Sequence, residues 1–194
     1  MRVEMSQKKV FKRCLYLLLL AVGLMPAGGA APLQAAAGPS EDLLSVCFAS
    51  EMQGWACGRW GSMFHTTDGG RTWNAQASGT SCTLASVCFV DPLSGWAVGD
   101  EGTIIHTGDG GKTWMPQQSP ARFYLMKVQF LNSLQGYIVT EHTYIFYTDD
   151  GGVTWGTMFS DGDFILKSVS FCDPLHGWAV GEYGFIYHTS TGGA

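Results

Sequence analysis

The residues of this sequence that could do acid–base or metal chemistry recur at a fixed interval of 41 residues. Asp68, Asp109 and Asp150 each stand in the pattern Thr-x-Asp-Gly-Gly-x-Thr-Trp. Carboxylates hydrolyse a glycosidic bond only when two of them flank the same bond. Equivalent positions of a repeated structural unit lie on separate units. We therefore expect the three aspartates not to converge on one substrate, and we predict no catalytic residue among them.

The histidines follow the same interval. His65, His106 and His188 occupy one repeat position, and Tyr147 is the remaining copy. Ligands of a zinc ion must lie within about 3 Å of one another, which positions on different units do not satisfy away from a central axis. We predict structural, hydrogen-bonded histidines, with no metal and no cofactor.

The recurring pattern has the chemistry of a tight turn. Asp followed by two Gly between apolar, β-branched segments is typical of a hairpin, because Gly adopts positive φ without steric cost. The Asp carboxylate accepts nearby backbone N–H groups, and the Trp begins the next strand with a large apolar side chain. We predict a structural role for the acid and the indole of each full copy, namely Asp68, Trp73, Asp109, Trp114, Asp150 and Trp155.

These turns belong to an all-β repeat. In the second copy, strands are expected at 85–89, 96–99 and 103–107 and from Trp114 onward. Four short antiparallel strands per 41-residue repeat are typical of β-propeller blades. The repeats are approximately 44–84, 85–125, 126–166 and 167–194, so the sequence holds three full repeats and an incomplete fourth. Because a repeat stack must cover its terminal apolar faces, we expect a fragment of a larger propeller. Association of chains and a four-bladed ring are the alternatives.

The N-terminal 37 residues have the features of a secretory signal peptide. A basic segment precedes an apolar run of 12 residues from Cys14 to Met25, and small residues follow. Such a run is too short to span a bilayer. We expect cleavage before the repeat domain, residues 38–194, and export to the periplasm, the thylakoid lumen or the extracellular space. No direct membrane insertion is expected after cleavage.

The charge of the exported part argues against nucleic-acid binding. Residues 1–37 hold five of the 11 basic residues and one of the 16 acidic ones, which leaves six against 15 and a formal net charge of −9. A chain this acidic lacks the basic surface that a nucleic acid requires.

Five cysteines remain in the exported part, at positions 47, 57, 82, 88 and 172. Export permits disulfides, and a hairpin pair Cys47–Cys57 is one interpretation. The other is that both are small packing residues, because Cys88 and Val98 stand at the equivalent positions of the next repeat.

The repeat resembles that of the photosystem II stability/assembly factor family, and its turn resembles the Asp box of sialidase-type repeats. The second repeat carries the match in Phe89-x-Asp-Pro, Gly95-Trp-Ala-Val-Gly99 and Thr107-x-Asp-Gly-Gly-x-Thr-Trp114. The resemblance implies an exported, non-enzymatic β-propeller scaffold that binds a protein partner, with membrane-protein subunits under assembly as the expected kind. The alternative is a secreted carbohydrate-binding or degenerate sialidase-like glycosidase module, although only three arginines follow residue 37.

Loop chemistry indicates where a partner would bind. In an antiparallel four-stranded blade, the loop between the second and third strands emerges at the same edge as the loop that enters the next blade. Aromatic residues and Arg are enriched in protein interfaces. The predicted partner-binding face comprises Arg59, Trp60, Arg122, Phe123, Tyr124 and Tyr183. Ordinary loop variation is the competing interpretation.

Overall fold

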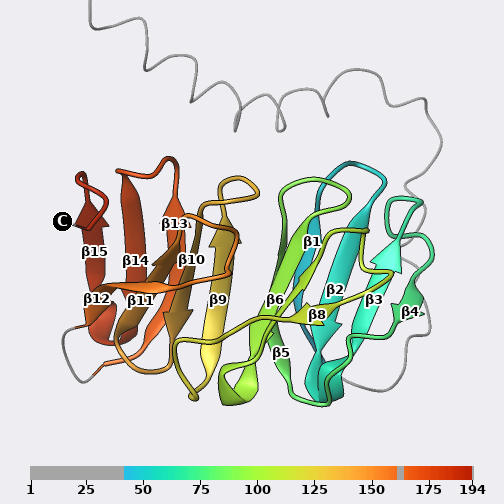
Figure 1. The fold of residues 1–194 in the computed structure, drawn as a ribbon, viewed down its shortest axis with the longest axis horizontal. Helices are drawn as coiled ribbons and strands as arrows, with labels where there is room; N and C mark the ends of the chain where they lie inside the picture. The colour runs from blue at the N-terminus through green and yellow to red at the C-terminus, as the bar shows by residue number, and fades with distance from the viewer. Residues whose placement is uncertain (1–41, 161–163, 194) are drawn as a thin grey trace, which may run out of the picture. The chain divides into compact units, whose positions relative to one another are not determined.

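The computed structural model describes residues 42–160 and 164–193. The predicted signal peptide, residues 1–37, and its cleavage region lie outside the described residues. No helix in the described part of the chain is long and apolar enough to cross a bilayer. The predicted all-β fold is confirmed, because the described chain forms four small antiparallel sheets, here called blades 1 to 4 (Figure 1).

The strands of each blade follow one another in chain order. Blade 1 contains β1 (Leu43–Phe48), β2 (Gly54–Gly58), β3 (Met63–Thr66) and β4 (Asn74–Gln76). Blade 2 contains β5 (Leu84–Phe89), β6 (Gly95–Gly99), β7 (Ile104–Thr107) and β8 (Met115–Pro116). Blade 3 contains β9 (Leu125–Phe130), β10 (Gly136–Thr140), β11 (Tyr144–Thr148) and β12 (Gly156–Ser160). Blade 4 contains β13 (Leu166–Phe171), β14 (Gly177–Gly181) and β15 (Ile186–Thr189).

Neighbouring blades are joined by stacked aromatic rings. Trp55 of β2 stacks on Phe89 of β5 with ring centroids 3.6 Å apart, and Trp96 stacks on Phe130 at the same distance. Tyr137 and Phe171 repeat the contact at 3.7 Å between blades 3 and 4. A blade is therefore apolar on both faces, and every residue of β2, β6 and β10 is buried.

The Asp-box turns also join the blades, a role that the sequence pattern did not reveal. Trp55 Nε1 donates to the Gly110 carbonyl at 3.1 Å, and Trp96 Nε1 donates to that of Gly151 at 3.0 Å. Gln76 Nε2 donates to the Gly110 carbonyl as well, at 3.2 Å. The boxes of blades 2 and 3 thus each satisfy the buried indole N–H of the blade before.

The innermost strands carry a second set of polar contacts between blades. The N–H of Val87 donates to Ser45 Oγ, and that of Phe89 donates to Cys47 Sγ, both at 3.2 Å. At the third joint, Gln129 replaces the thiol, and its Oε1 accepts the N–H of Phe171 at 2.8 Å. Side chains on one innermost strand therefore satisfy the axis-facing N–H groups of the next.

Of the two interpretations of Cys47 and Cys57, the structure shows the packing residues and not the hairpin disulfide, because both thiols are free. The register pairs Cys47 with Trp55 and Cys57 with Ser45, so the two cysteines are diagonal neighbours. Each instead contacts the backbone of blade 2, where Cys57 Sγ donates to the Leu84 carbonyl at 3.4 Å. Burial raises the pKa of the Cys57 thiol to about 12, which suits a small packing residue.

The histidines are held by ring stacking. His65 stacks on Trp55 at 4.5 Å, and His106 and His188 contact Trp96 and Trp178 at 4.8 Å. The prediction of hydrogen-bonded histidines is wrong for His65, whose Nε2 is buried without a partner. Burial lowers the pKa of His65 and His106, so both rings are neutral at pH 7 and stack as apolar groups.

Candidate functional site

The loops of the blades gather at two opposite edges, which we call the box edge and the turn edge. The box edge holds the Asp boxes and the loops between the first two strands, joined by bonds such as Gly110 N–H to the Leu93 carbonyl at 2.9 Å. The turn edge holds three short 3₁₀ turns, η2 (Arg59–Gly61), η3 (Asp100–Gly102) and η4 (Glu182–Gly184). Loops 77–83 and 117–124, which lead from one blade to the next, lie at this turn edge beside η2 and η3.

At the box edge, each Asp-box carboxylate accepts hydrogen bonds from its own hairpin. Asp109 Oδ1 accepts the Thr107 hydroxyl at 2.8 Å and the Thr113 N–H at 2.9 Å, and Oδ2 accepts the Thr113 hydroxyl at 2.7 Å. Asp68 and Asp150 make the same three bonds. Hydrogen bonds from the second threonine and then from the first lower the pKa of each carboxyl to about 2. These anions stabilise turns, and none shares a substrate site with another.

At the turn edge, three turns hold a large residue in a sterically unfavourable backbone conformation. Trp60, Glu101 and Tyr183 have φ of 58°, 55° and 55°, and they are the non-glycine residues with positive φ in the described chain. Left-handed backbone is uncommon for side chains of this size and costs about 1 kcal/mol or more. Trp60 and Tyr183 are 70% and 88% exposed, so their rings gain no burial in return.

The loops beside η2 and η3 hold these two turns in this conformation. The N–H of Arg59 donates to the Asp42 carbonyl at 3.0 Å, and the Ser78 hydroxyl donates to the Gly61 carbonyl at 2.6 Å. A Cβ on Gly102 would lie 2.0 Å from the Ala121 carbonyl oxygen, so a glycine must follow the left-handed residue. In η2 and η3, close packing against the loops therefore forces the preceding side chain outward, whereas a Cβ on Gly184 of η4 would meet no atom within 4 Å.

Of the six residues predicted for the partner-binding face, four are exposed and two are half-buried. Arg59, Trp60, Arg122 and Tyr183 are exposed. Phe123 is half-buried against His142 and Tyr144, with ring centroids 4.9 and 5.5 Å away. Removing the Phe123 ring would therefore disturb the fold as well as the surface.

Tyr124 links blades 2 and 3 at the turn edge. Its N–H donates to Glu141 Oε1 at 2.9 Å, within blade 3. Burial raises the pKa of its phenol, and the Asp100 carboxylate of η3 raises it further. Arg59 of blade 1 exerts a weaker, opposite effect on the same phenol. Loops of three successive blades thus lie within electrostatic reach of Tyr124.

The sequence contained a signal for the left-handed residues that we did not use. Each of the three occupies the middle position of a three-residue turn that ends in Gly, as in Arg59-Trp-Gly61. Blade 3 has Glu141-His-Thr143 at this position, and its turn is not a 3₁₀ turn. The terminal glycine, with positive φ in all three turns, is what separates the two forms.

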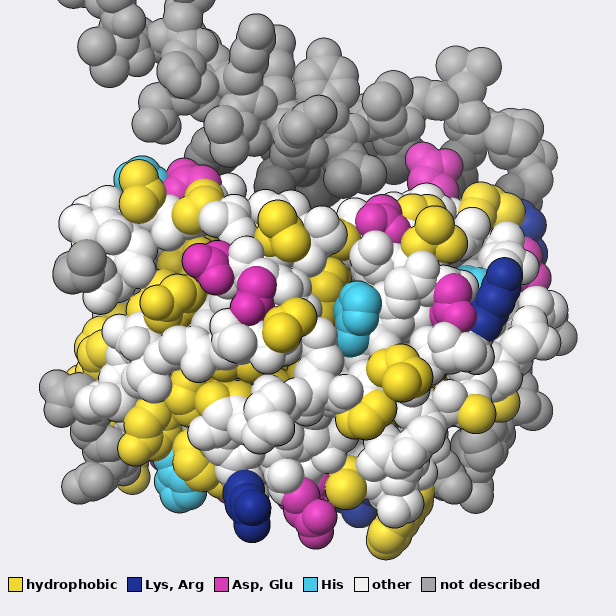
Figure 2. Space-filling view, viewed as in Figure 1, with side chains coloured by type: hydrophobic (Ala, Val, Ile, Leu, Met, Phe, Trp, Pro, Cys, Tyr) yellow, Lys and Arg dark blue, Asp and Glu magenta, His cyan; other side chains and the backbone are white. Residues whose placement is uncertain are grey.

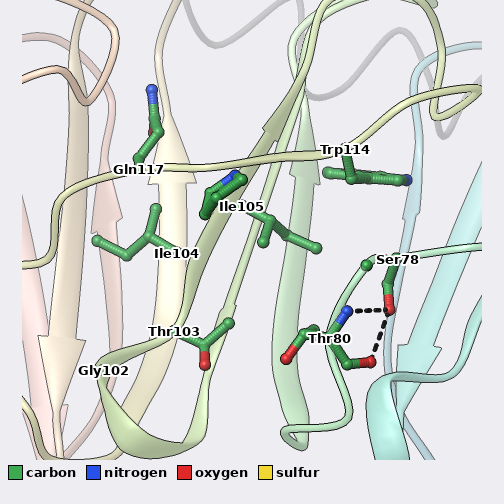
Figure 3. A pocket seen from close by; sticks show the side chains of 10 residues that line it. Ser78, Thr80, Gly102, Thr103, Ile104, Ile105, Trp114 and Gln117 are labelled. Atoms are coloured by element: carbon green, nitrogen blue, oxygen red, sulfur yellow. Dashed lines mark hydrogen bonds between the residues drawn. The ribbon is translucent and has the colours of Figure 1, made fainter.

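A cavity of about 240 Å³ lies between loop 77–83 and the outer strands of blade 2 (Figure 3). The Ser78 hydroxyl organises the loop beside it, bonding both the N–H and the carbonyl of Thr80. None of the lining residues titrates, and they are Ser78, Gly79, Thr80, Gly102, Thr103, Ile104, Ile105, Trp114, Pro116 and Gln117. Within the described residues, no three His, Cys, Asp or Glu side chains are placed to hold a metal ion.

Four-stranded blades joined through stacked rings and Asp boxes define a β-propeller repeat protein. The family model for the photosynthesis system II assembly factor YCF48 matches residues 38–116, 76–158 and 116–194. The chain belongs to this family, as the repeat pattern predicted. A search of curated proteins gave no match.

Two solved YCF48 structures share the fold. "YCF48 bound to D1 peptide" is 23% identical with a TM-score of 0.69, over 84% of this chain and 55% of that one. YCF48 from Cyanidioschyzon merolae is 22% identical with a TM-score of 0.63, over 76% and 53%. The chain thus spans about half the length of these relatives.

A GH74 enzyme from Niastella koreensis is more distant, at 13% identity and a TM-score of 0.59, over 75% of this chain and 30% of that one. Identity this low shows a shared propeller fold only.

Proposed function

We propose that this protein is an exported, non-enzymatic scaffold whose turn edge binds an extended segment of a protein partner. The partner is a membrane-protein subunit under assembly. Family membership supports the scaffold role, and a related YCF48 structure is described as bound to a D1 peptide.

One observation carries the proposal. Trp60, Glu101 and Tyr183 have left-handed backbone conformations at the same position of three blades. Residues with strained backbone concentrate where a protein meets a ligand, and the side chains of Trp60 and Tyr183 are largely exposed. Trp and Tyr are also among the residues that dominate binding energy at protein interfaces.

Recognition would combine ring stacking with pairing of charges. The exposed rings of Trp60 and Tyr183 offer apolar area with few rotatable bonds. Arg59 and Arg122 add positive charge to an otherwise acidic molecule, and Arg59 is already oriented by Asp42 at 3.2 Å. An extended peptide with apolar side chains fits the two exposed rings.

The backbone strain provides a specific test. In Trp60→Gly and in Tyr183→Gly, the new residue adopts positive φ freely, so the free energy of unfolding should stay within about 1 kcal/mol of the wild type or rise. Binding of a fluorescently labelled D1 peptide, measured by anisotropy, should weaken at least about tenfold in each variant.

The matched control is Leu93→Gly, which removes an exposed apolar side chain from the box edge and should leave peptide affinity unchanged. Equal affinity of wild type and both turn variants would reject the turn edge as the binding site. Turnover of a fluorogenic sialoside, lost with the Asp-box variants, would instead favour the glycosidase alternative.

A further inference from the structure

Each covered joint between blades is built from the same two surfaces. We call the surface that a blade packs against the following blade its outgoing half-face, and the surface that it packs against the preceding blade its incoming half-face. The outgoing half-face of blade 2 presents Trp96, Val98 and Ile104. The incoming half-face of blade 3 presents Leu125, Val128 and Phe130. Equivalent residues form the joints between blades 1 and 2 and between blades 3 and 4. In all three joints these side chains are buried almost completely.

Blades 1 and 4 each leave one such half-face open. Blade 4 presents Trp178, Val180 and Ile186 at the outgoing positions, and Trp178 is 42% exposed whereas Trp96 is 1% exposed. Blade 1 presents Leu43, Val46 and Phe48 at the incoming positions, and Val46 is 60% exposed. The two open half-faces are therefore the two halves of the joint that occurs three times within the chain.

Polar groups of the two open half-faces match as well. In the covered joints, the outgoing indole N–H donates to a box carbonyl 55 positions further along the chain. The equivalent pair at the open half-faces is Trp178 Nε1 and the Gly69 carbonyl. Ser170 occupies the position from which Cys47 and Gln129 accept the N–H of Phe89 and Phe171. Its hydroxyl would accept the N–H of Phe48 in the same way.

The open half-faces do not meet within one chain. Blades 1 and 4 lie at opposite ends of the series of sheets (Figure 1). Figure 2 shows hydrophobic side chains gathered on the surface at the end of the molecule formed by blades 3 and 4. Clustered apolar side chains on a surface mark an interaction site, and the residues at these positions are of the same kinds as those that pack on the incoming half-face in the covered joints.

We propose that two copies of this protein associate head to tail, with blade 4 of each copy packed on blade 1 of the other. A head-to-tail contact between identical chains forms a closed ring when the rotation between copies returns to the start, and eight blades is within the range of known propellers. With roughly 100 Å² covered on each of six side chains per joint, two joints bury on the order of 1,000 Å², the area a specific interface needs. This inference does not depend on the function of the turn edge.

Light scattering on a sizing column tests the proposal with the purified full chain. We expect twice the chain mass at about 100 µM, and monomers for Trp178→Glu and for Val46→Glu, because each substitution places a charge in both joints. Ile186→Glu provides a second block of the outgoing half-face. All three side chains are exposed in the single chain, so far-UV circular dichroism of the variants should match the wild type.

Mixing the two blocked variants sharpens the test. Val46→Glu retains an intact blade 4 face, and Trp178→Glu retains an intact blade 1 face, so an equimolar mixture should form a one-joint heterodimer. Leu93→Glu, an exposed apolar position at the box edge, should remain dimeric.

Three results would overturn the proposal: a monomeric wild type at 100 µM, a dimer unaffected by the blocking variants, or no heterodimer on mixing. A monomer whose Trp178 is shielded from acrylamide would point to closure within one chain instead.

Discussion

The segments Gly95–Gly99 and Gly177–Gly181 have the same sequence, Gly-Trp-Ala-Val-Gly, and opposite environments. Every residue of β6 is buried, whereas Trp178 and Val180 of β14 are exposed. Both strands pair with two neighbours in an antiparallel sheet and place a histidine against the indole. The difference is that β6 has a following blade that contributes Phe130, and β14 has none within the described chain. In a repeat protein, the joint and not the strand is the unit of stability.

The largest expected effect contrasts the two tryptophans directly. In a chain kept monomeric by Val46→Glu, Trp96→Ala should lower the free energy of unfolding by about 3–5 kcal/mol, because it removes a buried ring and leaves a cavity. Trp178→Ala in the same background should cost less than about 1 kcal/mol. Urea unfolding followed by far-UV circular dichroism measures both. Equal losses would mean that the indole stabilises its own sheet rather than the joint.

A smaller difference in unfolding free energy is expected between polar substitutions in a covered joint and at an open half-face. Gln129 bonds both the N–H and the carbonyl of Phe171, at 2.8 and 2.9 Å. Gln129→Ala should cost about 1–3 kcal/mol, because it leaves the buried backbone groups unsatisfied. Ser170→Ala, at the equivalent position of blade 4, should leave the monomer's unfolding free energy unchanged in the Val46→Glu background. A loss of similar size in both variants would contradict the comparison.

The smallest effect concerns acid stability, which should come from the boxes of blades 1 to 3. Their carboxyl pKa of about 2 lies below the ordinary 3.8, so the unfolded chain binds more protons at low pH. This stabilisation is present in full above about pH 4 and is lost as the pH falls through 2. Blade 4 has Thr191 in place of the aspartate and contributes nothing to this loss.

The triple variant Asp68→Asn, Asp109→Asn, Asp150→Asn should therefore have a lower Tm at pH 7 and a flatter Tm profile between pH 4 and 2. Differential scanning calorimetry across that range measures the slope. Asp149→Asn, beside the third box, controls for loss of a negative charge. An unchanged slope in the triple variant would show that other carboxyls govern acid unfolding.

Much of the fold could be predicted because residues close together in the sequence determine each blade and the same residues recur in every repeat. The Asp-Gly-Gly turns and the short apolar strands between them predicted the blades and their order. The two edges also followed from antiparallel connectivity, and residues such as Trp60 and Tyr183 lie at the edge where loop order placed them. Three less local features were missed or wrongly predicted: the stacking of His65 on Trp55, the contact of Cys47 with blade 2, and the box carbonyl as partner of an indole. Each joins residues of different strands or blades whose distance a repeat period does not specify.

The sequence by itself determined the blade, because hairpin turns and strand pairing depend on residues within one period. Only the tertiary structure decided which copies of an identical segment are buried, which thiols face a neighbouring backbone, and which turn residues are forced outward. The physical reason is that burial depends on what packs against a face. That packing partner belongs to the next blade, as Phe89 does for Trp55, and the described residues supply none at the two ends of the series.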